Sequence, residues 1–310
     1  MKEKDFITII KQITNSEYIG DDCAYLKEMG IVITQDSLVE GVHFSLDYIT
    51  PEQLGYKSVM VNLSDIAASG AEPKYITVSL SMPACIESKF VEKLYTGMQK
   101  ACRQYNPQVK IAGGDITGGD KVFISICAIG SAINRRISSR KNAKPGYKII
   151  VSGNHGSSAA GLYLLLNGKN TPEKFIKSHL EPKAQILFGE KIAETIMQDY
   201  AMMDTSDGLM DTLSAIAYES GVSVEVDFDK IPYDKDIKQF ENWQDLILYG
   251  GEDYQLIAAV PQDFETSAAV IGKIKKGSGI DIITADKKIH LEKTDIENKL
   301  FNHFDTEKNI

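Results

Sequence analysis

The chain has 310 residues, of which 43% are hydrophobic, and this is enough for a full core and for two domains. Its 34 basic and 43 acidic residues give a net charge of -9, the wrong sign for a protein that reads a nucleic-acid backbone, so no nucleic-acid partner is expected. The N-terminus is charged, without a long apolar run, and no segment reaches membrane-spanning length, so we expect a cytoplasmic protein with no membrane partner.

In the first part of the chain, as far as about Ser131, β-rich runs alternate with helical runs. The strands are predicted from segments rich in Ile, Val and Thr that are bounded by Gly, Pro or Asp. They cover residues 31–37, 75–83 and 121–132.

Two helices lie between these strands. Thr50, Pro51 and Gln53 have the spacing of a capping box and predict the start of the first helix, which ends at Gly70. The second helix, over residues 88–105, carries its apolar side chains on one face.

The basic, polar stretch 134–146 interrupts this alternation and predicts a boundary between a domain of residues 1–135 and a domain of residues 146–310. Strands and helices alternate again after it. Strands are expected at 147–153, 221–228 and 253–260, and helices at 156–166, 182–200 and 204–221.

Five short acidic motifs are distributed along the chain. They are GDD at 20–22, TQD at 34–36, GGD at 113–115, DTSDGL at 204–209 and GGED at 250–253. Carboxylates that are brought together repel each other unless a cation lies between them. Because the motifs supply oxygen ligands without thiolates or clustered imidazoles, they favour a hard ion such as Mg²⁺, whose usual companion is a polyphosphate.

The first helix carries a polar stripe of Ser58, Asn62, Asp65 and Ser69 on one face. An isolated stripe of this kind usually faces solvent, but small polar residues around one Asp are more typical of the wall of a site. DTSDGL is expected at a helix start, where N-capping explains one oxygen well but not three, and where phosphate is favoured. GGD by itself is as typical of a plain turn as of a site.

Several other kinds of phosphate chemistry are disfavoured by the motifs that the sequence lacks. It contains no GxxxxGK[ST], HRD or DFG, and no GxSxG nucleophile elbow. Metal-assisted phosphoryl transfer is therefore favoured over covalent hydrolysis.

The order of the motifs resembles a known family. GDDCAYL, TQDSLVEGVHF, YKSVMVNLSDIAASGAEP, IAGGDITGG, DTSDGL and GGEDYQL are similar to the motifs of thiamine-monophosphate kinases. These belong to the ATP-binding superfamily that includes aminoimidazole ribonucleotide synthetase. The resemblance runs from about Gly20 to Phe304, nearly the whole chain.

The resemblance implies a two-domain α/β (α+β) fold like that of aminoimidazole ribonucleotide synthetase. In a homodimer, the N-terminal strands would form a barrel across the two subunits, with the C-terminal α/β domain alongside. It also implies direct, ATP-dependent phosphorylation of thiamine monophosphate to thiamine diphosphate with several Mg²⁺ ions.

The resemblance also assigns site residues. The metal positions match Asp22, Thr34, Gln35, Asp36, Asp65, Asp115, Asp204 and Asp207. The ATP positions match Gly114, Asp115, Arg140 and Ser206, and the thiamine-facing positions match His43, Glu252 and Phe301.

The sequence departs from the family pattern at a few of these places. Gln35 replaces the usual Thr, which leaves its backbone carbonyl as the ligand that the position can offer. Ile116 and Gly118 replace the usual Thr and Arg, which removes side-chain phosphate contacts from that loop. Phe301 could equally be a core aromatic residue.

Two alternative functions stay open. One is another ATP-dependent synthetase of the same superfamily, and the other is a non-catalytic sensor of nucleotide or thiamine phosphate. The presence of every Asp in the metal set favours catalysis over sensing.

Overall fold

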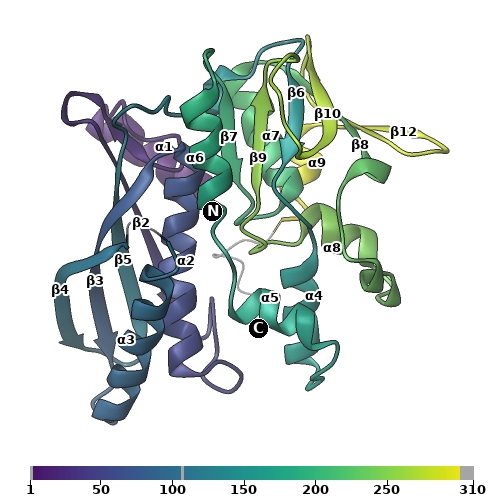
Figure 1. The fold of residues 1–310 in the computed structure, drawn as a ribbon. Helices are drawn as coiled ribbons and strands as arrows, with labels where there is room; N and C mark the ends of the chain where they lie inside the picture. Colours follow the sequence, from purple (N-terminus) through teal and green to yellow (C-terminus); the bar gives the residue numbers. More distant parts are fainter. Residues whose placement is uncertain (1–2, 106–107, 301–310) are drawn as a thin grey trace.

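The computed structural model describes residues 3–105 and 108–300, so Phe301 lies outside the described residues. The strands form a five-stranded and a seven-stranded sheet (Figure 1). In spatial order, the first sheet contains β1 (Ala24–Leu26), β2 (Ile31–Val39), β5 (Phe123–Ser131), β3 (Glu72–Met82) and β4 (Lys110–Gly118). Strands β3 and β4 run parallel, and the other pairs in this sheet are antiparallel.

Helices α2 (Pro51–Ser69) and α3 (Ser88–Cys102) pack against one face of this sheet, and α1 (Glu3–Thr14) precedes it in the chain. The capping box predicted for α2 is confirmed: Gln53 N donates to Thr50 Oγ1, and Thr50 N donates to Gln53 Oε1. Gly55 and Gly97 let α2 and α3 approach closely, because a Cβ at either position would collide with a backbone carbonyl of the other helix.

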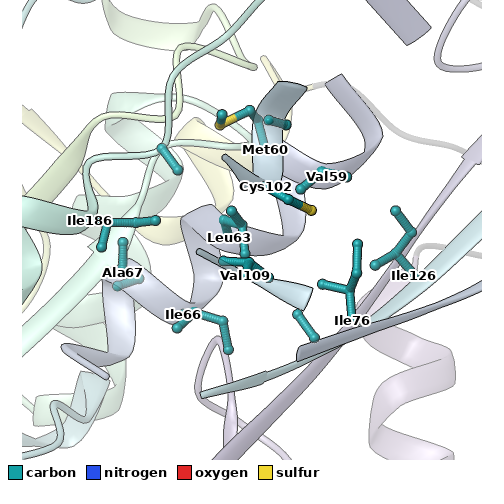
Figure 2. Close-up of a cluster of buried hydrophobic side chains, with 14 of the residues drawn as sticks. Val59, Met60, Leu63, Ile66, Ala67, Ile76, Cys102, Val109, Ile126 and Ile186 are labelled. Carbon is teal, nitrogen blue, oxygen red and sulfur yellow. The ribbon is translucent and has the colours of Figure 1, made fainter. Parts of the chain in front are cut away.

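Helix α2 is buried on nearly all sides because it lies between the two sheets (Figure 1). Figure 2 shows Ile76 and Ile126 of the first sheet on one side of α2, and Ile186 of α6 (Ile186–Thr195) on the other. The helix also contacts β7 (Ala201–Asp204). Residues of α2 therefore face groups from both halves of the chain.

The seven-stranded sheet follows the basic stretch. Its spatial order is β12 (Lys288–Leu291), β11 (Ile280–Ile283), β8 (Ser223–Asp227), β10 (Ala269–Lys275), β6 (Lys148–Val151), β9 (Leu256–Val260) and β7. Besides α6, the helices of this half of the chain are α4 (Ser157–Leu166), α5 (Glu173–Leu180), α7 (Leu209–Ser220), α8 (Trp243–Tyr249) and α9 (Lys293–Glu297).

Strand β9 is buried on both faces and separates two hydrophobic clusters. Leu256 and Ala258 belong to the cluster around α2, whereas Ile257 and Ala259 pack with residues of α4 and α7. The two halves of the chain thus share one continuous core along α2. The predicted boundary at 134–146 carries the 3-10 turn Arg140–Asn142 and stays a prediction.

Some predicted elements were wrong in place or extent. GGD lies inside β4, a strand that was not predicted, and the helix predicted over 182–200 is limited to α6. Asp204 ends strand β7, so it does not lie at a helix start as predicted; α7 begins five residues later with Gly208 as its N-cap.

No helix in the part of the chain that the structure describes is long and apolar enough to span a membrane.

Candidate active site

Three carboxylates meet between the two sheets. Asp22 comes from the turn before β1, Asp65 from α2, and Asp204 from the end of β7. Each offers an oxygen, and these oxygens all lie within 4.8 Å of one another. We refer to Asp22, Asp65 and Asp204 as the three-aspartate cluster. It confirms that motifs far apart in the sequence converge in the fold.

The cluster carries more negative charge than its surroundings offset. Burial, together with the charges of Asp22 and Asp36, raises the pKa of Asp204 to about 7, although a hydrogen bond from Ser64 opposes them. Burial also raises the pKa of Asp65 well above its usual value, with added repulsion from Asp36. A divalent cation would relieve both effects, and the donors present are the oxygens that Mg²⁺ prefers.

Neighbouring polar groups fix the positions of these carboxylates. Thr34 Oγ1 donates to Asp65 Oδ2 at 2.6 Å, and Ser64 Oγ donates to Asp204 Oδ2 at 2.5 Å. Asp36 N donates to Asn62 Oδ1 at 2.9 Å, which holds β2 against α2. Asp65 and Asp204 are therefore held by hydrogen bonds between packed elements.

The polar stripe on α2 does not face solvent. Ser58, Asn62 and Ser69 are buried, and Asn62 anchors β2 as described above. The hydroxyl groups of Ser58 and Ser69 donate to carbonyls of their own helix, so these two side chains support the helix itself. Asp65 is the member of the stripe that reaches the cluster.

Arg140 lies against the cluster and is not a solvated linker residue. Its Nη2 donates to Asp22 Oδ1 at 2.8 Å, and its backbone N donates to Asp21 Oδ1 at 2.7 Å. The side chain is only 22% exposed. The position suits a planar, permanently charged group for binding phosphate oxygens beside the carboxylates.

The DTSDGL and GGED segments contact each other. Glu252 N donates to Ser206 O at 2.7 Å. A Cβ at Gly208, whose φ is 105°, would lie 2.9 Å from Gly250 O, so the close approach requires glycine there. Asp207 is exposed in this loop, and its charge acts with those of Asp36 and Asp204 on the buried phenol of Tyr254.

The two acidic residues of GGED have different partners. Glu252 Oε1 lies 3.0 Å from Lys57 Nζ, and Glu252 Oε2 lies 3.2 Å from His179 Nδ1. Asp253 instead accepts hydrogen bonds from the backbone N–H groups of Gly156 and Ser158 at the start of α4. Asp253 thus anchors the segment, while Glu252 faces the space between the two sheets.

Three predicted site residues are not brought to the cluster. In register, Asp115 of β4 aligns with Ser79, Ser79 with Ser125, and Ser125 with Ser37 of β2. Asp115 is therefore three strands, or about 14 Å, from β2, on the sheet face opposite α2. Gly114 precedes it in the same edge strand. Gln35 also points to that opposite face, where its Nε2 donates to Ser125 Oγ at 3.1 Å.

His43 lies near Glu252. Its Nδ1 accepts a hydrogen bond from Val39 N at 3.1 Å, and its ring is among the groups that act on the pKa of Glu252, which is lowered against burial mainly by the charge of Lys57. The positions of His43 and Glu252 are compatible with one binding surface. The ligand roles of all these residues stay predictions.

Sequence reasoning missed four groups that surround the site: Ser64, Lys57, His179 and Tyr254. Lys57 could have been found, because a lysine within the otherwise buried segment 54–64 needs a partner. Tyr254 directly follows the GGED motif. His179 gave no signal, because neither its motif nor its spacing distinguishes it from a surface residue of an amphipathic helix.

Known proteins resemble this chain over most of its length. The family model described as AIR synthase related protein, N-terminal domain, matches residues 20–132, and the one described as AIR synthase related protein, C-terminal domain, matches residues 144–284. The thiamine-monophosphate kinase of Aquifex aeolicus (strain VF5) is 36% identical over 294 residues, which cover 90% of this chain and 93% of that protein. That of Bacillus subtilis (strain 168) is 35% identical, with 92% and 93% covered.

The solved structure of AaThiL complexed with AMPPCP and TMP has a TM-score of 0.84 to this chain at 34% identity. The alignment covers 94% of this chain and 96% of that chain. This similarity confirms the predicted two-domain α/β architecture.

Proposed function

Because the chain belongs to the thiamine-monophosphate kinase family, we propose that it transfers the γ-phosphate of ATP to thiamine monophosphate. The products would be ADP and thiamine diphosphate. The observation that carries this proposal is the three-aspartate cluster with Arg140 beside it, in a fold shared with a relative that is complexed with an ATP analogue and TMP.

The cluster would hold Mg²⁺, with Asp36, Thr34 and Asp207 around it. When bound, the metal supplies positive charge that offsets the repulsion between two phosphate-bearing anions. Ser64 and Thr34 keep the carboxylates oriented through their hydrogen bonds. Arg140 and the Ser206 segment would bind phosphate oxygens of the nucleotide. The acceptor phosphate is already ionised near neutral pH, so transfer needs no strong general base.

Tyr254 lies between the proposed metal site and the proposed thiamine site. Burial raises the pKa of its phenol, and Glu252, Asp36 and Asp204 raise it further, so the ring lies among carboxylates of both ends. We place the thiamine group beside Glu252 and His43, and its phosphate toward the cluster. This orientation directs the acceptor oxygen to the γ-phosphate for direct in-line transfer.

We also propose a homodimer. The sheet face opposite α2 carries exposed residues such as Tyr75, Gln35 and Ser79, and a second copy would cover it. Because Asp115 and Gly114 are too far from the cluster of their own chain, they would act at the site of the second copy. The need for ATP supports a cytoplasmic location.

Incubation of the purified protein with ATP, Mg²⁺ and thiamine monophosphate tests the function. Thiamine diphosphate and ADP should form in equal amounts, and unphosphorylated thiamine should not replace the acceptor. Binding of ATP and thiamine monophosphate without any product would instead support the sensor alternative. Turnover of ATP only with another acceptor would support a different synthetase.

A further inference from the structure

Lys57 is a buried cation at the edge of the proposed thiamine site. Its side chain is 0% exposed, and its Nζ lies 3.0 Å from Glu252 Oε1. An ammonium group is costly to bury unless it is paired, so the position of Lys57 depends on this carboxylate. The Glu252 side chain is 24% exposed, so it is the member of the pair that a ligand can reach.

His179 supports the second oxygen of the same carboxylate. Its side chain is 2% exposed on α5, and its Nδ1 lies 3.2 Å from Glu252 Oε2 and 3.1 Å from Ser158 Oγ. Burial and the charge of Lys57 lower the pKa of His179 to about 3, against the opposing charge of Glu252. The ring is therefore neutral near pH 7 and can donate one N–H, at Nδ1, to the carboxylate.

The backbone holds Glu252 in the orientation that these two donors require. Glu252 has a φ of 64° and Tyr254 a φ of 50°, values that cost energy for residues with a side chain. The conformation is kept by the hydrogen bond from Glu252 N to Ser206 O and by the two bonds from the start of α4 to Asp253. The position of the carboxylate is thus held by Lys57, by His179 and by the hydrogen bonds of its own main chain.

We propose that Lys57 and His179 are positioning residues that keep the Glu252 carboxylate charged and turned toward the acceptor. They thereby determine the affinity for the thiamine end of the acceptor. This inference rests on the proposed function. Because Lys57 and Glu252 cancel in net charge, the carboxylate recognises its ligand through directed hydrogen bonds to donors such as an amino group, and less through attraction to a positive charge.

Three variants separate this role from a purely structural one: Lys57→Met, Glu252→Gln and the double variant. Titration calorimetry gives the dissociation constants of thiamine monophosphate and of AMPPCP with Mg²⁺, and thermal melts give stability. Each single variant should lower the affinity for thiamine monophosphate about tenfold or more, which is the effect of losing one charge-assisted hydrogen bond. The dissociation constant of AMPPCP should change by less than about threefold, because no hydrogen bond to the nucleotide is removed and the loss of one such bond would have a larger effect.

The double variant is the decisive comparison. It removes both charges, so no unpaired buried charge remains, and its melting temperature should recover relative to Lys57→Met. Its affinity for thiamine monophosphate should stay low. If that affinity recovers together with stability, the ion pair is structural only, and the inference is wrong. Lys148→Met is a matched control, because Lys148 Nζ binds the carbonyl of Phe264 far from this network.

His179 is tested by a pair of substitutions. His179→Phe keeps an aromatic ring but removes the N–H donor. It should lower the affinity for thiamine monophosphate and leave the affinity for AMPPCP unchanged. His179→Asn places an amide nitrogen where Nδ1 lies and should retain more of the affinity. Equal affinities for thiamine monophosphate in these two variants would contradict the positioning role of His179. If the wild type forms thiamine diphosphate while Lys57→Met binds thiamine monophosphate normally, only this inference fails; if the wild type forms none, the proposed function fails.

Discussion

Arg140 and Asp22 form an ion pair at the centre of the site, with Arg140 Nη2 2.8 Å from Asp22 Oδ1. Asp22 is one of the three carboxylates that would hold a metal ion, so the guanidinium and the metal would share its negative charge. When a nucleotide binds, its phosphates offer Arg140 another partner. The pair would therefore couple metal binding to nucleotide binding.

Arg140→Gln should raise the affinity for Mg²⁺ alone and lower the affinity for AMPPCP measured with Mg²⁺. The first change follows from removing a competing positive charge, and the second from losing a phosphate contact worth about tenfold or more in affinity. Titration calorimetry measures both. Unchanged values for both ligands would show that Arg140 only ties the linker to Asp21 and Asp22.

Binding of Mg²⁺ to the metal-free protein should release protons. The pKa of Asp204 is raised to about 7 by burial and by Asp22, so this carboxyl is partly protonated near neutral pH. Because the folded-state pKa lies above the ordinary value of 3.8, stability without metal should fall as pH rises from about 4 through about 7. Calorimetry in buffers of different ionisation enthalpy should give more protons released at pH 6 than at pH 8. Equal release at both would contradict the raised pKa.

Asp65→Asn should abolish turnover while the protein stays folded. The amide keeps the size of the side chain but loses the charge that would hold Mg²⁺. Since the substitution also removes repulsion from Asp36, Asp204 and Asp22, the metal-free variant should melt no lower than the wild type. Asp263→Asn, at an exposed position away from the cluster, is the control and should keep full activity. A near-normal rate for Asp65→Asn would remove Asp65 from the metal site.

Asp115 and Asp204 should complement each other between subunits. Asp115→Asn and Asp204→Asn should each be inactive, and an equal mixture that is unfolded and refolded together should recover about a quarter of wild-type activity. Half of the dimers would be mixed, and each would contain one intact site. No recovery in mixtures that contain mixed dimers would place Asp115 at the site of its own chain, against the strand register.

Local signals predicted the N-terminal half well. Thr50 and Gln53 make the capping box that the sequence indicates, because a cap depends on neighbouring residues alone. Strand β4 was missed because Gly113 and Gly114 have low strand propensity. The start of α7 was misplaced because Asp204 resembles an N-cap residue, whereas it ends a buried strand.

The site could be predicted only as a set of residues. The acidic motifs singled out Asp22 and Asp204, the polar stripe of the first helix singled out Asp65, and the fold brings the three together. The sheet face that Asp115 and Gln35 occupy could not be predicted, since it depends on strand register. The partners of Glu252 come from α2 and α5, and no local pattern links those helices to the GGED segment.

Single turnover with ATP labelled in its γ-phosphate tests the central claim most directly. The protein, in excess over ATP and supplied with thiamine monophosphate and Mg²⁺, is quenched at short times. We expect the label to pass to thiamine diphosphate at the rate at which ADP forms, with none retained on the protein, and we expect EDTA to stop the transfer. Label appearing first on the protein, or only as inorganic phosphate, would contradict direct transfer to the acceptor at this site.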